Sequence, residues 1–226
     1  MAVYTKIGLD EINLIEKNFS IGKILNYSGI KKGIENTNYL IKSKKRKFIL
    51  TIFEKRVNSR DLPFFMKLMS GLAKSKIKCP KPVENKKGKY LFKLKGKNAC
   101  LVTFLEGKDK NNLNSKECFV IGKNIARLHN SSKKLRIFRK NSLSVNSWGP
   151  LLKKISRKIN KKFKDLTDNM KTDYIQIKKL WPKKLPTGII HGDLFIDNIF
   201  FFKGSFYGFI DFYFSSNRSE EHTSEL

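Results

Sequence analysis

Apolar and polar positions alternate over short runs in the N-terminal half, a pattern that predicts β-strands separated by turns. We expect strands over residues 23–30, 38–42, 48–53, 90–92 and 99–105. Helical spacing occurs over 10–19 and again over 61–77, where Asp61 precedes Pro63 and can serve as the N-cap. The N-terminal half is therefore predicted to be α+β, with one helix inserted between the third and fourth strands.

The pattern becomes helical from residue 115 onward. Ser115 is the expected N-cap of a helix whose apolar positions include Phe119 and Ile121. A longer helical stretch is expected over 148–180, and the prolines that follow it end the pattern. Three short apolar runs then follow, over 188–190, 198–202 and 206–212. The C-terminal half is predicted to be helical first and to end in short strands.

Composition indicates a folded chain and excludes several classes of protein. Of the 226 residues, 40% are hydrophobic and 12% are aromatic, which is more apolar material than a disordered polar chain carries. No run approaches the roughly 20 apolar residues that cross a bilayer, and the first residues lack a signal-peptide pattern. Cys79, Cys100 and Cys118 form neither a disulfide framework nor a zinc-type pair. We expect a cytoplasmic protein with no membrane partner.

The formal net charge of +29 raises the question of nucleic-acid binding. The basic residues are mostly Lys, and they are spread along the whole chain among Asn, Ile and Phe. Such a composition is typical of the codons of an AT-rich genome. We therefore expect no specific nucleic-acid partner. A basic nucleic-acid-binding module stays open as the alternative of a different class, and it would bind with a steep salt dependence.

The chemistry of the chain is concentrated in IIHGDLFIDNIFF and the following KGSFYGFIDFYF. Asp193 and Asn198 lie between two apolar runs, and Asp211 closes a later one. A single Asp or Asn in a loop is most often a turn or cap residue. The combined spacing, however, matches a kinase catalytic loop followed by a metal-binding Asp. These residues supply what phosphoryl transfer needs, a carboxylate for the hydroxyl proton and oxygen ligands for Mg²⁺.

HGDLFIDN resembles the signature of the aminoglycoside phosphotransferase and choline kinase superfamily, which is similar to protein kinases in fold. Together with GIKKGIENTNYLI, FILTIFEKR, CPKPV, VTFLEGK and IDFYF, it makes residues 1–217 similar to bacterial homoserine kinases of the choline-kinase-like type. The resemblance implies a bilobal, protein-kinase-like fold with a small β-rich N-terminal lobe and a mainly helical C-terminal lobe, incomplete here. It also implies ATP- and Mg²⁺-dependent phosphorylation of the L-homoserine hydroxyl, a step of threonine biosynthesis.

Roles for the motif residues follow from this resemblance. Asp193 would be the catalytic base, and Asn198 and Asp211 would be the Mg²⁺ ligands. His191 would order the loop. His129 lies on the apolar side of its helix and is expected to be structural rather than catalytic.

The resemblance also places the nucleotide. Gly29, Gly33 and Asn36 lie in the first hairpin, where the family covers the phosphates with backbone N–H groups. Residues 99–107 would form the hinge that meets the adenine, with Thr103 and Leu105 as the contact residues.

One position departs from the superfamily pattern. A Lys or Arg usually stands in the strand that corresponds to FILTIF and holds the α- and β-phosphates, but the matching position here is Thr51. Lys55 and Arg56 lie just beyond the strand, and each can equally be a solvated strand-end charge. The phosphate-binding cation is left unassigned.

The expected organisation is a nucleotide-binding lobe over 1–98, the hinge over 99–107 and a partial catalytic lobe over 108–217. Residues 218–226, RSEEHTSEL, look like the translation of a sequencing adapter and are expected to be non-native. Relatives continue for about three or four more helices, which would leave apolar surface exposed here. We therefore expect a poorly stable chain that is inactive by itself.

Two further alternatives stay open at this point. The acceptor could be another small hydroxyl-bearing amine, such as choline, ethanolamine or an aminoglycoside. The chain could also be an inactive truncated fragment that retains the catalytic loop.

Overall fold

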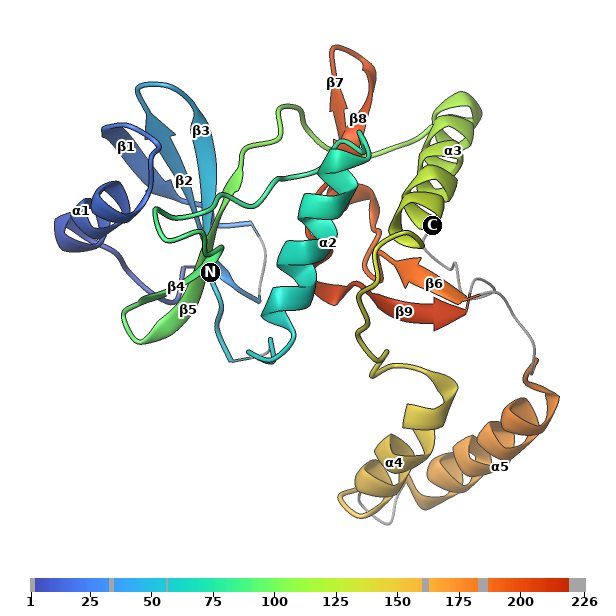
Figure 1. Cartoon of the computed structure of the whole chain (residues 1–226). Helices are drawn as coiled ribbons and strands as arrows, with labels where there is room; N and C mark the ends of the chain where they lie inside the picture. The colour runs from blue at the N-terminus through green and yellow to red at the C-terminus, as the bar shows by residue number, and fades with distance from the viewer. Residues whose placement is uncertain (1–2, 33–34, 56, 160–162, 183–186, 220–226) are drawn as a thin grey trace.

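The computed structural model describes residues 3–32, 35–55, 57–159, 163–182 and 187–219. These residues form two lobes that lie side by side (Figure 1). The N-terminal lobe is built on a five-stranded antiparallel sheet. The second lobe combines helices with two short strand pairs, and it carries the residues predicted to be catalytic.

The sheet of the N-terminal lobe has the strand order β1-β2-β3-β5-β4. Its elements are α1 (Leu9–Asn18), β1 (Ile24–Gly29), β2 (Thr37–Ser43), β3 (Lys47–Ile52), β4 (Leu91–Leu94) and β5 (Lys97–Thr103). Every second residue of β2 is buried, as expected for a strand with one face on a core. The buried face packs against α1 through residues such as Ile15, Phe19 and Leu50.

The second lobe is held to the sheet by one apolar core. Helix α2 (Leu62–Lys74) lies between the two lobes. The elements of the second lobe are α3 (Ser115–Ser132), β6 (Thr187–Ile190), the 3₁₀ turn η2 (Ile196–Asn198), β7 (Ile199–Phe202), β8 (Ser205–Phe209), the 3₁₀ turn η3 (Phe212–Phe214) and β9 (Ser216–Ser219). β6 pairs with β9, and β7 pairs with β8. The largest apolar cluster joins Phe65 of α2, Ile121 of α3, Phe209 of β8 and Val102 of β5. Because α2 is apolar on most of its surface, it fits between the two lobes rather than on the outside.

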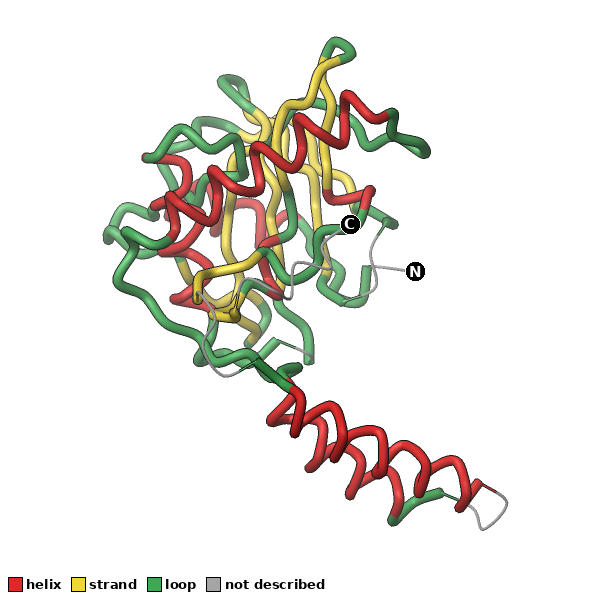
Figure 2. Tube along the Cα trace, turned by 90° about the vertical axis from the view of Figure 1, so that its right-hand side faces the viewer, coloured by secondary structure: helices red, strands yellow, loops and turns green. Residues whose placement is uncertain are grey.

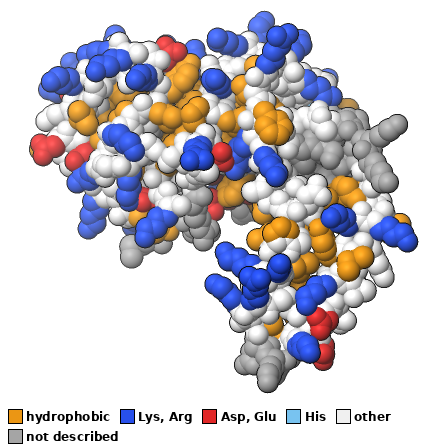
Figure 3. Space-filling model, turned by 60° about the horizontal axis from the view of Figure 1, so that its bottom comes forward, with side chains coloured by type: hydrophobic (Ala, Val, Ile, Leu, Met, Phe, Trp, Pro, Cys, Tyr) orange, Lys and Arg blue, Asp and Glu red, His pale blue; other side chains and the backbone are white. Residues whose placement is uncertain are grey.

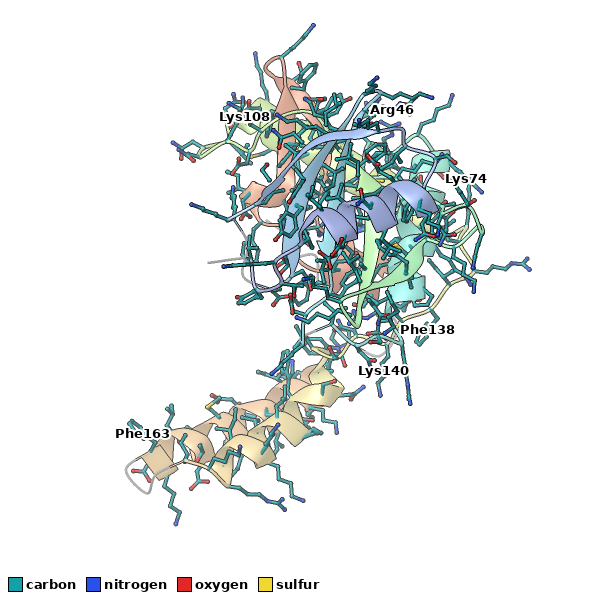
Figure 4. The ribbon with its side chains drawn as sticks, turned by 90° about the vertical axis from the view of Figure 1, so that its left-hand side faces the viewer. Arg46, Lys74, Lys108, Phe138, Lys140 and Phe163 are labelled. Carbon is teal, nitrogen blue, oxygen red and sulfur yellow. The ribbon has the colours of Figure 1, made fainter. Side chains whose placement is uncertain are left out.

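A helical hairpin projects from this body (Figure 2). It consists of α4 (Val145–Ser156) and α5 (Lys164–Leu180), which contact each other. Figure 4 shows Phe163 at the far end of the hairpin and Lys140 at its base. Apolar side chains stand exposed along it, among them Leu151, Leu166 and Leu180.

The structure confirms the five expected strands of the N-terminal half, with one helix inserted between the third and fourth strands. The mixed α/β class is likewise confirmed. No helix in the described part of the chain is long and apolar enough to span a membrane. Cys79 and Cys100 are buried as free thiols, and Cys118 is also unpaired.

Several local expectations were wrong. Asn114, not Ser115, caps α3, because its Oδ1 accepts the Glu117 N–H at 3.0 Å. Phe119, expected inside, is 74% exposed. The helical stretch 148–180 is two helices, α4 and α5. The run 206–212 ends as a strand at Phe209.

Asp61 occupies the N-cap position of α2, but its side chain makes no capping hydrogen bond. Its carboxylate instead accepts from Nε of Arg139 at 2.7 Å, an ion pair between segments far apart in the sequence. The backbone of β9 reaches Ser219, two residues beyond the boundary expected at Asn217. The rest of the expected tail, 220–226, lies outside the described residues.

Candidate active site

The predicted catalytic loop connects β6 to β7, and a glycine allows its sharp turn. Gly192 has φ +82°, a left-handed conformation that strains any other residue. A Cβ atom added there would lie 2.8 Å from the carbonyl oxygen of Phe214. The loop backbone therefore packs directly against η3, which places Asp193 next to the segment that carries Asp211.

Asp193 and Asn198 are joined by hydrogen bonds across the loop. Nδ2 of Asn198 donates to the backbone carbonyl of Asp193 at 2.7 Å and to its Oδ2 at 3.3 Å. The backbone carbonyl of Asn198 in turn accepts the N–H of Ile210 at 3.0 Å. These bonds orient the Asn198 side chain so that its amide oxygen bonds to no described residue and is free to ligate a cation.

Asp211 directly follows Ile210 in the sequence and precedes η3. Its backbone is left-handed, with φ 63° and ψ 63°, a conformation uncommon for a residue other than glycine and enriched at functional sites. Desolvation and the charge of Asp193 raise the pKa of Asp211 from 3.8 to about 6. The two carboxylates therefore share one site, and they repel each other in the absence of a cation.

His191 ties the two segments together. Its Nε2 donates to the carbonyl of Ile210 at 2.8 Å, and its ring lies 4.6 Å from that of Phe212. The backbone carbonyl of His191 accepts from Oγ of Ser215 at 2.9 Å. Burial lowers the pKa of His191 to about 4, so the ring is neutral near pH 7. This geometry fits the loop-ordering role predicted for it.

Glu35, which the sequence did not single out, contributes a further carboxylate near Asp193 and Asp211. Burial raises the pKa of Asp193, and the charges of Asp197 and Glu35 raise it further. Glu35 also raises the pKa of Asp211. It is half-buried on the loop between β1 and β2 and was present in the GIENTNY motif. Its spacing from the catalytic loop along the chain gave no signal that the two meet.

The residues predicted to cover the phosphates lie at the β1–β2 turn. Gly29 is the last residue of β1 and pairs with Tyr39, whereas Gly33 lies outside the described residues. Asn36 is buried, and its Oδ1 accepts the N–H of Glu54 at 3.3 Å. The side chain of Asn36 thus fixes the end of the turn to the end of β3.

The predicted hinge residues close β5 and lead into the second lobe. Thr103 uses both its N–H and its hydroxyl to bond the backbone of Lys81, each at 2.9 Å. Leu105 is half-buried, and among the described residues its backbone groups have no hydrogen-bond partner. The backbone groups of Leu105 are therefore open to a ligand, whereas the Thr103 N–H is already bonded to Lys81.

The strand position that usually carries a phosphate-binding cation has an uncharged network instead. Oγ1 of Thr51 donates to Asn38 at 2.8 Å and accepts from the hydroxyl of Tyr213 at 3.4 Å. Lys55 is exposed at the end of β3, and Arg56 lies outside the described residues. Within the described part of the chain, His, Cys, Asp and Glu form no ready-made group of three that could hold a metal.

Known proteins are similar to this chain in sequence. The model of the phosphotransferase enzyme family matches residues 26–218. A homoserine kinase of Agrobacterium fabrum is 41% identical over 217 residues, which is 96% of this chain and 67% of that protein. A homoserine kinase of Sinorhizobium medicae is 39% identical with the same coverage. The chain thus spans about two thirds of the length of these relatives.

Solved structures show the fold. Spectinomycin phosphotransferase, in complex with ADP and spectinomycin, matches with a TM-score of 0.67 at 16% identity, over 96% of this chain and 72% of that one. Amicoumacin kinase, in complex with AMP-PNP, Ca²⁺ and Ami, matches with a TM-score of 0.73 at 18% identity, over 93% of this chain and 66% of that one. The bilobal, protein-kinase-like fold is therefore confirmed. The chain belongs to the phosphotransferase enzyme family and, within that family, to the group of the bacterial homoserine kinases.

Proposed function

We propose that this chain transfers the γ-phosphoryl group of ATP to the side-chain hydroxyl of L-homoserine and so forms O-phospho-L-homoserine. The observation that carries the proposal is the 41% identity to a homoserine kinase over 96% of this chain. The hydrogen-bonded set of Asp193 and Asn198 beside Asp211 supports it, because it supplies the groups that such a transfer needs.

Asp193 acts as the base in this proposal. Its carboxylate accepts the proton of the substrate hydroxyl as the oxygen forms its bond to the γ-phosphorus, and ADP leaves with the electrons of the broken P–O bond. Hydrogen bonding to Asn198 holds the carboxylate in place. Positioning and charge neutralisation account for most of the rate, since phosphoryl transfer asks little covalent chemistry of a protein.

Asn198 and Asp211 fit a divalent cation, which we propose to be Mg²⁺. One amide oxygen and one carboxylate leave room for phosphate and water oxygens, the coordination that Mg²⁺ usually keeps. The raised pKa of Asp211 marks an excess of negative charge that a cation would relieve. Bound there, Mg²⁺ would neutralise the charge of the β- and γ-phosphates.

The nucleotide is proposed to lie between the lobes. The phosphates would lie under the backbone of Gly29, Gly33 and Asn36, and the adenine would lie against Thr103 and Leu105. The three expected segments, 1–98, 99–107 and 108–217, then serve as nucleotide lobe, hinge and catalytic lobe. The partner is a small molecule, and specific nucleic-acid binding is not part of the proposal.

The proposed function and the inactivity expected from the sequence alone make opposite predictions for the 226-residue chain, and ADP release decides between them. The acceptors to compare are L-homoserine, choline, ethanolamine and an aminoglycoside, each with ATP and Mg²⁺. We expect release with L-homoserine to exceed that with the others, and Asp193→Asn to lower it by about 100-fold or more. Asp173→Asn, an exposed change on α5, is the matched control and leaves release unchanged. Release that depends on choline or an aminoglycoside, or that survives in Asp193→Asn, contradicts the proposal.

A further inference from the structure

A row of uncharged polar side chains crosses the sheet of the N-terminal lobe where the two lobes meet. Asn38 of β2, Thr51 of β3 and Cys100 of β5 are direct partners in the strand register. Residues directly opposite each other in neighbouring strands present their side chains on the same face of a sheet. Cys100 belongs to the apolar cluster that joins the two lobes, so this face of the sheet is turned toward the second lobe.

Tyr213 of η3 adds its hydroxyl to this row. The hydroxyl oxygen lies 3.4 Å from Oγ1 of Thr51 and 3.6 Å from Sγ of Cys100. Burial raises the pKa of the Cys100 thiol to about 12 and the pKa of Tyr213 well above its ordinary value, so both groups keep their hydrogen at pH 7. The thiol can therefore donate to Tyr213, and the hydroxyl of Tyr213 donates to Thr51. Oγ1 of Thr51 donates in turn to Oδ1 of Asn38 at 2.8 Å.

Aromatic neighbours from two elements hold the ring of Tyr213. The ring of Phe53, directly after β3, lies edge-on to it with the centroids 5.1 Å apart. The ring of Phe65 on α2 lies edge-on as well, at 5.8 Å. Both separations are within the range that favours edge-to-face packing. These contacts restrict the ring, so the direction of its hydroxyl toward the sheet is set by packing as well as by the hydrogen bond to Thr51.

The backbone of Tyr213 contacts the proposed metal ligand. Desolvation raises the pKa of Asp211, and a hydrogen bond from the backbone N–H of Tyr213 to the Asp211 carboxylate opposes that rise. Asp211 itself has a left-handed backbone, and η3 begins at the next residue. The position of its carboxylate thus depends on where η3 is held. Tyr213 provides this hold, because its N–H bonds Asp211 while its hydroxyl bonds the sheet.

We infer that Tyr213 is a positioning residue, which holds Asp211 in register with the sheet through the bond of its hydroxyl to Thr51. The inference rests on the proposed function, in which Asp211 binds Mg²⁺. Tyr213 acts through Asp211 and needs no contact of its own with the substrate or the metal. Thr51 then acts on the proposed metal ligand rather than directly on the nucleotide phosphates.

Binding of AMP-PNP to the 226-residue chain measures this positioning without requiring turnover. Its dissociation constant is determined by calorimetry in Mg²⁺ and in chelator, and the ratio of the two constants is the Mg²⁺ gain. Tyr213→Phe removes only the hydroxyl, Thr51→Val replaces the other hydroxyl by a methyl group, and Thr51→Ser keeps it. Tyr39→Phe is the matched control, because the Tyr39 hydroxyl donates to the Thr5 carbonyl at 3.0 Å within the other apolar cluster.

We expect Tyr213→Phe and Thr51→Val each to lower the Mg²⁺ gain by about three-fold or more. The double variant should have the same gain as Thr51→Val alone, because both changes remove the same bond. Thr51→Ser and Tyr39→Phe should keep the gain within about two-fold. If Tyr213→Phe does not fold, the comparison of Thr51→Val with Thr51→Ser decides alone.

Three results overturn the inference. The first is a loss of AMP-PNP affinity that is equal in Mg²⁺ and in chelator, which a purely structural role would produce. The second is losses that add in the double variant, and the third is a gain that falls as far in Tyr39→Phe as in Tyr213→Phe.

The same titrations separate this inference from the proposed function. A Mg²⁺ gain that is present in the unmodified chain and unchanged in Tyr213→Phe removes the positioning role and leaves the proposed metal site. A gain that is absent from the unmodified chain, or that survives in Asp211→Asn, removes Asp211 as a metal ligand and the inference with it.

Discussion

Asn198 uses the two ends of its amide for different purposes. Its nitrogen bonds Asp193 at both the backbone and the side chain, which leaves the oxygen for a cation. Its backbone carbonyl bonds Ile210, next to Asp211. One residue therefore sets the relative position of the proposed base and of both proposed metal ligands. This dependence explains why the H-G-D-L-x-x-x-N spacing identifies the site so well: the fold has little freedom to place these groups otherwise.

Replacing Gly192 by Ala tests how closely the loop must approach η3. The new Cβ would lie 2.8 Å from the Phe214 carbonyl in a left-handed backbone, so the loop has to shift. We expect a loss of about 1–3 kcal/mol of stability and a fall in kcat, measured by thermal unfolding and ADP release. Gly88→Ala, at a left-handed turn with open space around it, is the control and strains only its own backbone. Equal kcat values for the two variants would contradict this account of the loop.

The raised pKa of Asp211 predicts a pH-dependent stability. Its folded pKa of about 6 lies above the ordinary 3.8, so the folded state binds the proton more tightly. That stabilisation is fully present below pH 3.8 and is lost as pH rises through about 6. In chelator at pH 7.5 we therefore expect Asp211→Asn to have a higher Tm than the unmodified chain, with a smaller gain at pH 5.

The control for that experiment is Asp173→Asn, which removes an exposed carboxylate far along α5. Addition of Mg²⁺ with ATP should reverse the order and stabilise the unmodified chain more, because only it retains the carboxylate ligand. A Tm of Asp211→Asn at or below that of the unmodified chain in chelator would show that the carboxylate carries no excess charge.

Local spacing in the sequence predicts some residues of the candidate site but not others. Asp193 and Asn198 lie within one short loop, so sequence alone brings them together. Glu35 reaches the site only because the β1–β2 turn folds over the second lobe, and Arg139 only because it pairs with Asp61. Such contacts depend on the packing of the two lobes, which no local pattern encodes.

At the scale of elements, apolar periodicity located the helices and strands but not always their faces. Phe119 lies two residues before Ile121 and six before Ile125, which places it off the face that α3 buries, and its side chain is exposed. Asp61 has the right place for a cap, yet the stronger charge-assisted bond to Arg139 takes its carboxylate. The N-terminal half was divided correctly into elements, whereas the helical stretch expected over 148–180 is two helices, α4 and α5.

The hairpin of α4 and α5 exposes apolar side chains on one face of α5. Leu166, Met170, Ile177 and Leu180 have the spacing of one face of α5, and each is at least 40% exposed. Figure 3 shows apolar side chains gathered between Lys and Arg on the side of the molecule that the hairpin occupies. A contiguous apolar face of this kind is an aggregation liability.

We expect the chain to bind a hydrophobic dye and to self-associate. Replacing Leu166, Ile177 and Leu180 together by Ser should lower both signals severalfold. The matched control replaces three dispersed and similarly exposed residues of the body, Leu9, Leu25 and Phe119. Dye fluorescence and light scattering measure the effect, and an equal drop in the two triple variants would refute a contiguous face.

In the whole molecule, the N-terminal lobe packs against the second lobe through one shared apolar core. Val102 of the sheet and Phe212 beside Asp211 belong to the same apolar cluster, so the two halves of the site are packed rather than loosely hinged. The motifs in the sequence predict both lobes. No motif predicts the cavity of about 490 Å³ beside Asp193, because it forms only where the segment 139–143, the β1–β2 turn and η3 come together.

Detecting the transfer of phosphate from ATP to the hydroxyl of L-homoserine tests the proposed function most directly. ³¹P NMR of the 226-residue chain with ATP, Mg²⁺ and L-homoserine should show a phosphomonoester resonance that grows as ADP forms. The same resonance should be absent with Asp193→Asn. ADP formation without the phosphomonoester, or the phosphomonoester at an undiminished rate in Asp193→Asn, would contradict the account.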